Sequence, residues 1–444
     1  MKLVDIQTLN VDLSSGVGLN SSANLSGEDL TKVVVSGSGE LDFNSATIVG
    51  SNTGLSFDGS AATGSIALKI NSDSNAVSNI KGGKGADNIE INGVKSSSGG
   101  LTVNSDAGND VITITTNGDG ANAIIDINGG NDTDKLVLNS GVDLSATNLT
   151  LTSVEKISIP GNGISPKMAA SDISTKSFTL EKEGSGNTSL TVVADQNTLD
   201  LSSLQFASSF AFDNDSIIIN GSTSSSGITV TGSNTKNLLT GSNANDILSG
   251  GSRNDTISGG TGDDSITGKT GSDSLTGGAG DDVFNFSALD STQQIMDKIT
   301  DFQAAAADSH NDSINNVTGS RGANVASLDV KAAISGDSTG KTVTAAVANG
   351  IVTLSGTNSG LINTLEEWLD VISINGVIVK AADDADAVGT VAFEFNGNTY
   401  VVESNDTFNN NTPNVAIVNI IELTGLTNAV SVAEAAAANT IMIA

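Results

Sequence analysis

Residues 241–285 read GSNANDILS GGSRNDTIS GGTGDDSIT GKTGSDSLT GGAGDDVFN, which is one nine-residue phrase repeated five times without an insertion. Each phrase has an aspartate at its sixth position and an apolar residue at its eighth. The aspartates are Asp246, Asp255, Asp264, Asp273 and Asp282, and the apolar residues are Leu248, Ile257, Ile266, Leu275 and Phe284. The phrase fits the nonapeptide G-G-x-G-x-D-x-U-x, in which U is apolar, and this nonapeptide is typical of a calcium-binding parallel β-solenoid.

The spacing has a physical reason. Six residues rich in glycine make a tight loop, because glycine adopts positive φ freely, and the next three make a short strand whose apolar residue points inward. Two phrases complete one coil, so loops two phrases apart stack in columns. We define the first column as Asp246, Asp264 and Asp282, and the second column as Asn237, Asp255 and Asp273, with Asn237 contributed by an imperfect preceding phrase, GSNTKNLLT.

Stacked aspartates need a cation between them. Adjacent strands lie about 4.8 Å apart, and two carboxylates at that distance repel by about 3.5 kcal/mol at an effective dielectric of about 20. Calcium tolerates crowded, flexible oxygen cages better than magnesium does. The predicted metal ligands of these phrases, aspartates, the asparagine and loop glycines together, are Asn237, Asp246, Gly250, Asp255, Gly259, Gly262, Asp264, Gly268, Gly271, Asp273, Gly277, Gly280 and Asp282.

Three looser phrases of the same kind occur upstream, at residues 82–89, 106–112 and 129–136. Their final aspartates, Asp87, Asp110 and Asp134, are 23 and 24 residues apart. This spacing predicts a wider β-helix with a calcium loop on one corner of each coil. The predicted ligands here are Gly82, Gly85, Asp87, Asp106, Gly108, Asp110, Gly129, Asp132 and Asp134.

Composition supports a repeat fold. Aromatic residues make up only 3% of 444 residues, against 50 glycines, so a narrow core of small branched residues is favoured over a large globular core. The net charge of −31 argues against nucleic acid and anionic membranes as partners. The chain contains no cysteine, and it contains neither a run of 18 apolar residues nor a secretory signal peptide at its start, so we expect no disulfide and no membrane span.

The sequence predicts an all-β chain in four parts. Residues 1–160 form the β-helix with spaced calcium loops, residues 161–215 form a loop or small β excursion, and residues 216–290 form the nonapeptide β-roll. Residues 291–444 form a mainly β C-terminal region with an edge that closes the roll at 297–312. In this region we expect one helix, Asn363 to Ile372, with Trp368 in the core, and a hairpin that turns at Asn396 and Gly397.

The repeats resemble those of RTX (hemolysin-type) proteins exported by type I secretion. The order of features resembles more narrowly the bacterial surface-layer proteins of the Caulobacter and Campylobacter kind: spaced G-G-x-G-x-D-x-I loops, a V-E-x-I-x-I strand, a tight nonapeptide roll and a terminal F-x-F-x-G-x-T-Y-V-V pattern at Phe393 to Val402. The resemblance implies a right-handed parallel β-helix, bound Ca²⁺, an uncleaved C-terminal secretion signal and self-association into a lattice outside the cell. It also implies that lipopolysaccharide anchoring uses an N-terminal region absent here.

Three functions follow as hypotheses. The first is a structural, calcium-dependent surface-layer (S-layer) subunit on the bacterial cell surface. The second is an RTX adhesin, for which residues 161–215 are the plausible binding tip. The third, a secreted enzyme, is disfavoured, because the chain has a single histidine, His310, and lacks both H-E-x-x-H and G-x-S-x-G. The uncapped first strand, Ile6 to Val11, leads us to expect that the chain is the C-terminal part of a longer protein.

Overall fold

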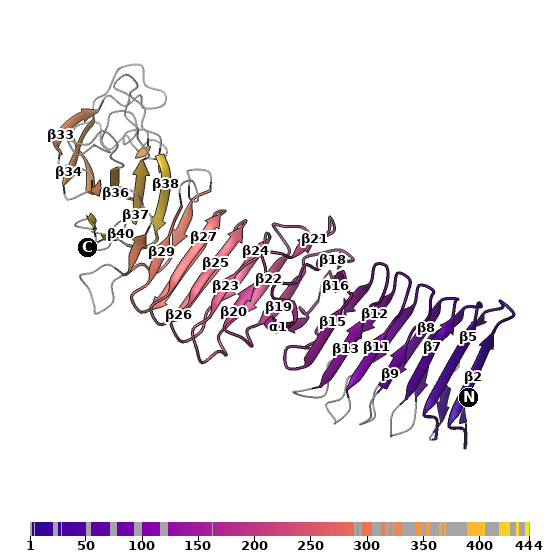
Figure 1. Ribbon diagram of the computed structural model, residues 1–444. Helices are drawn as coiled ribbons and strands as arrows, with labels where there is room; N and C mark the ends of the chain where they lie inside the picture. Colours follow the sequence, from indigo (N-terminus) through magenta and orange to yellow (C-terminus); the bar gives the residue numbers. More distant parts are fainter. Residues whose placement is uncertain are drawn as a thin grey trace, which may run out of the picture. The chain divides into compact units, whose positions relative to one another are not determined.

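A computed structural model gives the structure of the protein. It describes residues 2–3, 5–20, 25–27, 29–49, 55–71, 78–92, 100–115, 123–161, 163–287, 291, 295–303, 312–315, 320–321, 325–330, 343–348, 351–355, 364–365, 368–369, 389–404, 417–426, 432–434 and 440–443. The chain divides into two compact units, Met1–Asn220 and Gly221–Ala444. Figure 1 shows parallel strands stacked coil upon coil in each of them, which confirms the predicted all-β parallel solenoid.

The first unit consists of parallel strands that recur once per coil on each wall of the solenoid. One sheet contains β1 (Lys2–Leu3), β3 (Leu19–Asn20), β4 (Leu25–Gly27), β6 (Leu41–Val49), β8 (Ile66–Asn71), β10 (Asn88–Asn92), β12 (Val111–Ile114), β14 (Lys135–Leu138), β16 (Lys156–Pro160), β18 (Thr179–Glu183) and β21 (Gln205–Phe206). The second sheet contains β2 (Thr8–Leu13), β5 (Lys32–Gly37), β7 (Ser56–Ala62), β9 (Ser78–Lys81), β11 (Leu101–Asn104), β13 (Ile124–Asn128) and β15 (Asn148–Thr152).

The core of this unit consists of rows of aliphatic side chains that stack from coil to coil. In the first sheet, Ile89 is in register with Leu68 and Ile112, and Ile112 is in register with Leu136. These four side chains are completely buried. Alternate residues of a strand face opposite sides of a sheet, so one inward apolar residue in two is enough to fill the narrow interior. Few aromatic residues are needed, as the composition indicated.

Residues 161–215 continue the stack. The predicted loop or small excursion is replaced there by β17 (Lys167–Ala169), the short helix α1 (Ala170–Ile173), β18, β19 (Ser189–Val193), β20 (Thr198–Asp200) and β21. β18 pairs in parallel with β16, and β19 pairs in parallel with β17 and with β22 (Ser216–Asn220). The two prolines do not interrupt the sheets, because Pro160 ends β16 and Pro166 precedes β17, positions at which a strand tolerates proline.

The second unit begins with the narrow roll, in which two short strands complete a coil. One wall contains β23 (Thr229–Thr231), β25 (Ile247–Ser252), β27 (Ser265–Thr270), β29 (Val283–Asn285) and β31 (Ser313–Asn315). The other wall contains β24 (Lys236–Thr240), β26 (Thr256–Thr261), β28 (Ser274–Ala279) and β30 (Asp297–Ile299). All five predicted apolar positions of the phrases are buried, at 1% exposure or less. The two-phrase period of the roll is therefore confirmed.

The remaining strands of the second unit follow the roll. The wall that contains β30 continues through β38 (Ile417–Leu423), β37 (Asn398–Ser404), β36 (Gly389–Phe395), β35 (Ile351–Ser355), β34 (Val343–Ala348) and β33 (Val325–Val330), with β32 (Ser320–Arg321) beside β36. The wall that contains β31 continues through β40 (Thr440–Ile443) and β39 (Val432–Glu434). β36 and β37 form the predicted hairpin, which turns at Asn396 and Gly397, both with positive φ.

The predicted C-terminal helix is described in part. Leu365, Trp368 and Leu369 are helical, and the Trp368 N–H donates to the carbonyl of Thr364 at 3.2 Å. Trp368 stacks on Phe393 with a centroid distance of 4.8 Å and an interplanar angle of 4°. Its predicted packing role is therefore supported. The predicted ends of the helix, Asn363 and Ile372, lie outside the described residues, as does His310.

Candidate metal centre

The aspartates of the first column form a continuous hydrogen-bonded ladder inside the roll. Asp264 Oδ1 accepts the backbone N–H of Asp246 at 2.8 Å, and Asp282 Oδ1 accepts that of Asp264 at 2.9 Å. The ladder starts where Asp246 Oδ1 accepts the N–H of Ile228 at 2.7 Å. All three aspartate side chains are buried, at 2% exposure or less. Each rung thus ties one coil to the next through a carboxylate.

The second column repeats this arrangement on the opposite edge. Asp255 Oδ1 accepts the N–H of Asn237 at 2.7 Å, and Asp273 Oδ1 accepts that of Asp255 at 2.8 Å. The predicted sorting of the phrases into two columns is therefore confirmed. A buried backbone N–H needs an acceptor, and at these loop positions the acceptor is a carboxylate oxygen of the next coil.

The spaced phrases of the first unit build a third ladder. Asp110 Oδ1 accepts the N–H of Asp87 at 2.7 Å, and Asp134 Oδ1 accepts that of Asp110 at 2.9 Å. The ladder begins at the N–H of Ile66, bonded to Asp87 Oδ1 at 2.8 Å, and ends at Glu155 Oε2, which accepts the N–H of Asp134 at 2.8 Å. The longer coils of this unit are therefore joined by the same kind of carboxylate ladder as the coils of the roll.

The second carboxylate oxygen defines the chemistry of the ladders. Oδ2 is buried and has no hydrogen-bond partner in each of five aspartates, which are Asp110, Asp134, Asp255, Asp264 and Asp282. A buried anionic oxygen without a partner is strongly unfavourable, so such oxygens are found where a proton or a cation neutralises them. Because the five oxygens occupy equivalent positions, each coil requires a proton or a cation at the same place.

The first glycine of each phrase leaves room beside this oxygen. A Cβ placed on Gly259 would lie 2.1 Å from Asp264 Oδ2 and 2.6 Å from the carbonyl oxygen of Gly277 in the next coil. A Cβ on Gly250 would likewise lie 2.3 Å from Asp255 Oδ2. The predicted ligands Gly82, Gly129, Gly268 and Gly277 face their own aspartates in the same way, with Oδ2 between 2.2 and 2.5 Å away. Carboxylate and carbonyl oxygens of successive coils therefore share a space that any side chain would fill.

The remaining predicted glycines shape the loops. Gly108, Gly262, Gly271 and Gly280 have positive φ. At Gly85 a Cβ would lie 2.7 Å from the backbone of Gly64. Two predicted aspartates lie outside the ladders: Asp106 is half-buried and Asp132 is exposed, both at positive φ. The structure thus separates Asp106 and Asp132 from the ladder members Asp110 and Asp134.

Burial perturbs the acidity of the ladder. Loss of solvation is the largest cause, and it raises the pKa of Asp255 to about 8, of Asp264 to about 7 and of Asp282 to about 6. In the first unit it raises the pKa of Asp110 to about 7 and also raises that of Asp134. The neighbouring carboxylates Asp246 and Asp282 add to the effect at Asp264. Without a cation, these groups hold a proton more strongly than ordinary aspartates do.

The residues that end the two ladders lie at the edge predicted to close the roll, although the sequence did not place them among the ligands. Asp297 Oδ1 accepts the N–H of Asp273 at 2.8 Å, and Asp312 Oδ1 accepts that of Asp282 at 3.0 Å. Neither residue belongs to a glycine phrase. The available signal was the apolar residue two places later, at Ile299 and Ile314, both of which are fully buried.

The described residues bring no three Asp, Glu, His or Cys side chains together as a metal-binding group. A cation in a ladder would therefore depend on backbone carbonyls as well as on carboxylates. This donor set is hard and consists only of oxygen, which suits calcium and does not suit zinc. In the described part of the chain, no helix is long and apolar enough to cross a membrane.

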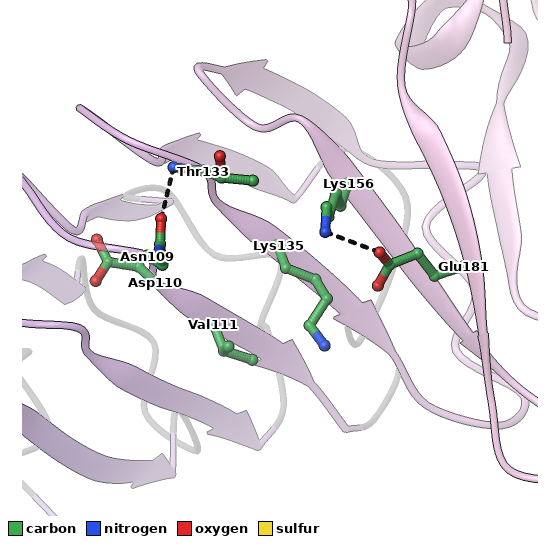
Figure 2. A pocket seen from close by; sticks show the side chains of 7 residues that line it. All are labelled: Asn109, Asp110, Val111, Thr133, Lys135, Lys156 and Glu181. Atoms are coloured by element: carbon green, nitrogen blue, oxygen red, sulfur yellow. Dashed lines mark hydrogen bonds and ion pairs between the residues drawn. The ribbon is translucent and has the colours of Figure 1, made fainter. Parts of the chain in front are cut away.

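A groove of about 370 Å³ lies beside the third ladder, lined by Asn109, Asp110, Val111, Thr133, Lys135, Lys156 and Glu181. Figure 2 shows that its polar groups already bind one another across the coils. Lys156 pairs with Glu181 at 3.0 Å, Lys135 pairs with Glu183 at 3.2 Å, and Thr133 N–H donates to Asn109 Oδ1 at 3.0 Å. These contacts make the groove part of the outer ion-pair surface, and we assign it no ligand.

Fold and site together define a parallel β-solenoid whose coils are joined by buried aspartate ladders. Comparison with known families agrees with this class. Residues 231–266, 240–275 and 258–290 match the RTX calcium-binding nonapeptide repeat. The chain therefore carries RTX repeats in the roll, at the positions where the two ladders of the second unit lie. No curated protein matches the chain.

Proposed function

We propose that the ladders bind calcium and that the protein is a calcium-stabilised structural component of the cell exterior. The observation that carries the proposal is the set of buried Oδ2 atoms without a hydrogen-bond partner. In the roll, Asp255, Asp264 and Asp282, together with the carbonyls of the loop glycines, would hold the ions. Bound calcium would supply positive charge between carboxylates of successive coils.

The protein orients the ladder carboxylates before calcium binds. The Oδ1 of each ladder aspartate is held by a backbone N–H, so the carboxylate is fixed in orientation before any ion arrives. The aliphatic core below the loops and the first glycine of each phrase keep the oxygens at a fixed spacing. Such preorganisation lowers the ordering cost of binding.

Extracellular modules bind calcium with dissociation constants of about 10⁻⁴ to 10⁻³ M. At that affinity, 1 mM calcium adds about 0.4 to 1.4 kcal/mol of stability per site, while cytosolic calcium adds almost nothing. Several such sites would make folding of the roll dependent on export. We therefore propose that the protein is secreted and folds outside the cell, with a type I system as the route that the resemblance suggests.

The finer proposal is a surface-layer subunit. It is supported by the resemblance of the feature order, by the regular repeat construction and by the acidic composition, with a net charge of −31. The adhesin alternative depended on residues 161–215 as a projecting tip, and strands of the stack occupy those residues instead. We propose a non-catalytic role, since the repeats account for the clustered aspartates.

The test is to image the purified protein by negative stain in 1 mM calcium and in excess EGTA. A surface-layer subunit should form ordered sheets with calcium and lose them in EGTA. Single particles under both conditions, at concentrations where calcium is bound, would refute lattice formation. Absence of calcium binding in equilibrium dialysis would refute the broader proposal.

A further inference from the structure

Asn237 is the first residue of the second column and occupies the position that aspartate has in the other phrases. Its side chain is completely buried. Both polar atoms of this side chain have hydrogen-bond partners, whereas Oδ2 of Asp255, the next residue of the column, has none. β24, which carries Asn237, and β26, which follows the Asp255 loop, lie on one wall of the roll (Figure 1) and pair in parallel.

The orientation of the Asn237 amide is fixed by its surroundings. Oδ1 faces two donors, the Ser233 N–H at 3.2 Å and the Ser233 hydroxyl at 2.9 Å. Nδ2 faces four oxygens: the carbonyls of Ser233 at 3.3 Å, Thr235 at 2.6 Å and Gly250 at 3.1 Å, and Asp255 Oδ1 at 3.0 Å. A flipped amide would place an oxygen against four acceptors, which excludes that assignment.

The four oxygens around Nδ2 belong to two successive coils. Ser233 and Thr235 lie in the loop of Asn237 itself, and Gly250 and Asp255 lie in the loop below. One coil further down, the equivalent space beside Gly250 contains Asp255 Oδ2 and the carbonyl of Gly268, at 2.3 and 2.9 Å from a Cβ placed there, and Oδ2 has no donor. We call the space between two successive loops of a column an interval. The first interval, between the loops of Asn237 and Asp255, thus contains a hydrogen-bond donor, and the second interval, below Asp255, contains none for Asp255 Oδ2.

We propose that the Asn237 amide takes the place of a calcium ion, so that the first interval of the second column is free of metal while the intervals below it bind calcium. The inference rests on the proposed calcium function. It revises the sequence-based assignment of Asn237 as a metal ligand, because its oxygen turns away from the shared space and its nitrogen turns into it. The head of this column therefore stays closed in the absence of calcium.

The Asn237→Asp substitution converts the donor into an acceptor. The new carboxylate oxygen would face three carbonyls and Asp255 Oδ1, all at the distances now held by Nδ2. Such an all-oxygen space, with two carboxylates, is the donor set that calcium prefers. The variant should therefore take up one calcium ion more than the wild type. Asp264→Asn is the reciprocal change, which puts an amide in an interior rung and should remove one ion.

The experiment is equilibrium dialysis of the full chain against calcium, with circular dichroism in calcium to establish that each variant is folded. Asn237→Ala is the matched control, because it removes the amide without adding a carboxylate, and it should not gain an ion. One additional ion in Asn237→Asp alone upholds the inference. An unchanged number of ions in folded Asn237→Asp overturns it.

A second measurement on the wild type does not depend on how the variant folds. Anomalous diffraction from calcium-grown crystals should show no calcium between residues 233–237 and 250–255, and a peak there overturns the inference while leaving the proposed function intact. If the wild type binds no calcium at all, the proposed function fails. The inference is then decided by Asn237→Asp, in which uptake of one ion upholds it and no uptake overturns it.

Discussion

Replacing Asp264 by alanine should open the roll locally, because this residue serves two purposes in the first ladder. Its Oδ1 accepts the buried N–H of Asp246 at 2.8 Å, and its Oδ2 has no partner in the protein. Loss of the acceptor leaves a buried donor unsatisfied, which costs about 1 to 3 kcal/mol. Loss of one calcium site removes about 0.4 to 1.4 kcal/mol more in 1 mM calcium.

Two further variants separate these effects. Asp264→Asn keeps an oxygen for the Asp246 N–H, so it should lose only the calcium contribution and be at least as stable as the wild type in EGTA. Asp263→Ala changes the adjacent exposed carboxylate, whose Oδ1 accepts the Asp281 N–H at the surface, and should cost well under 1 kcal/mol.

Hydrogen exchange of peptides covering residues 241–285, in calcium and in EGTA, measures the free energy of local opening. We expect Asp264→Ala to lower it by about 1.5 to 4.5 kcal/mol in 1 mM calcium and by about 1 to 3 kcal/mol in EGTA. Equal protection in Asp264→Ala and Asp263→Ala would refute the ladder as a stabilising structure. Equal losses with and without calcium would refute the calcium site at Asp264.

Three other changes give distinct outcomes. Gly259→Ala places a Cβ 2.1 Å from Asp264 Oδ2 at a position without a left-handed φ, so it should abolish one calcium site in dialysis. Gly184→Ala is the control, because Gly184 has φ +83 and its nearest neighbour is 3.9 Å from the added Cβ. This control should lower the free energy of unfolding by about 1 to 2 kcal/mol and leave calcium binding intact. Lys182→Ala should lower the free energy of unfolding in urea by about 3 to 5 kcal/mol, because it leaves the buried Asp215 carboxylate, 2.7 Å away, without its cation. Lys156→Ala breaks a partly exposed ion pair and should cost about 1 kcal/mol or less. In EGTA, the stability of the roll should fall as the pH rises from 5 to 8. The pKa of Asp264 in the folded state, about 7, exceeds its unfolded value, so the folded state binds more protons in this range. A midpoint of urea unfolding that rises with pH would contradict this assignment.

The two columns of the roll could be predicted from sequence because one aspartate and one apolar residue recur at a fixed interval. A strict period fixes which loops stack, and the same argument worked for Asp87, Asp110 and Asp134 despite longer coils. Where the glycine phrase is lost, the sequence indicated only an edge that closes the roll and did not identify which aspartates continue the ladders. Asp297 and Asp312 continue the ladders with only the following apolar residue to mark them.

Other features depend on information that spacing does not contain. The strands within 161–215 pair with the coils before and after them, but their phrases lack a shared motif, and Pro160 and Pro166 suggested an interruption. Asn237 has the register of a ladder aspartate, and only the three-dimensional arrangement shows that its nitrogen faces the oxygens. Asp106 and Asp132 match the phrase composition yet lie outside the ladder, at loop positions with positive φ.

The most direct test of the calcium ladder is hydrogen exchange at the ladder amides themselves, the N–H groups of Asp246, Asp255, Asp264 and Asp273. Each of these donates to a carboxylate of the next coil at 2.8 to 2.9 Å. Calcium held between the coils should slow exchange at all four amides together, and EGTA should restore fast exchange. Full protection of these amides in EGTA at pH 8, unchanged by 1 mM calcium, would contradict the central claim that the ladders are calcium sites.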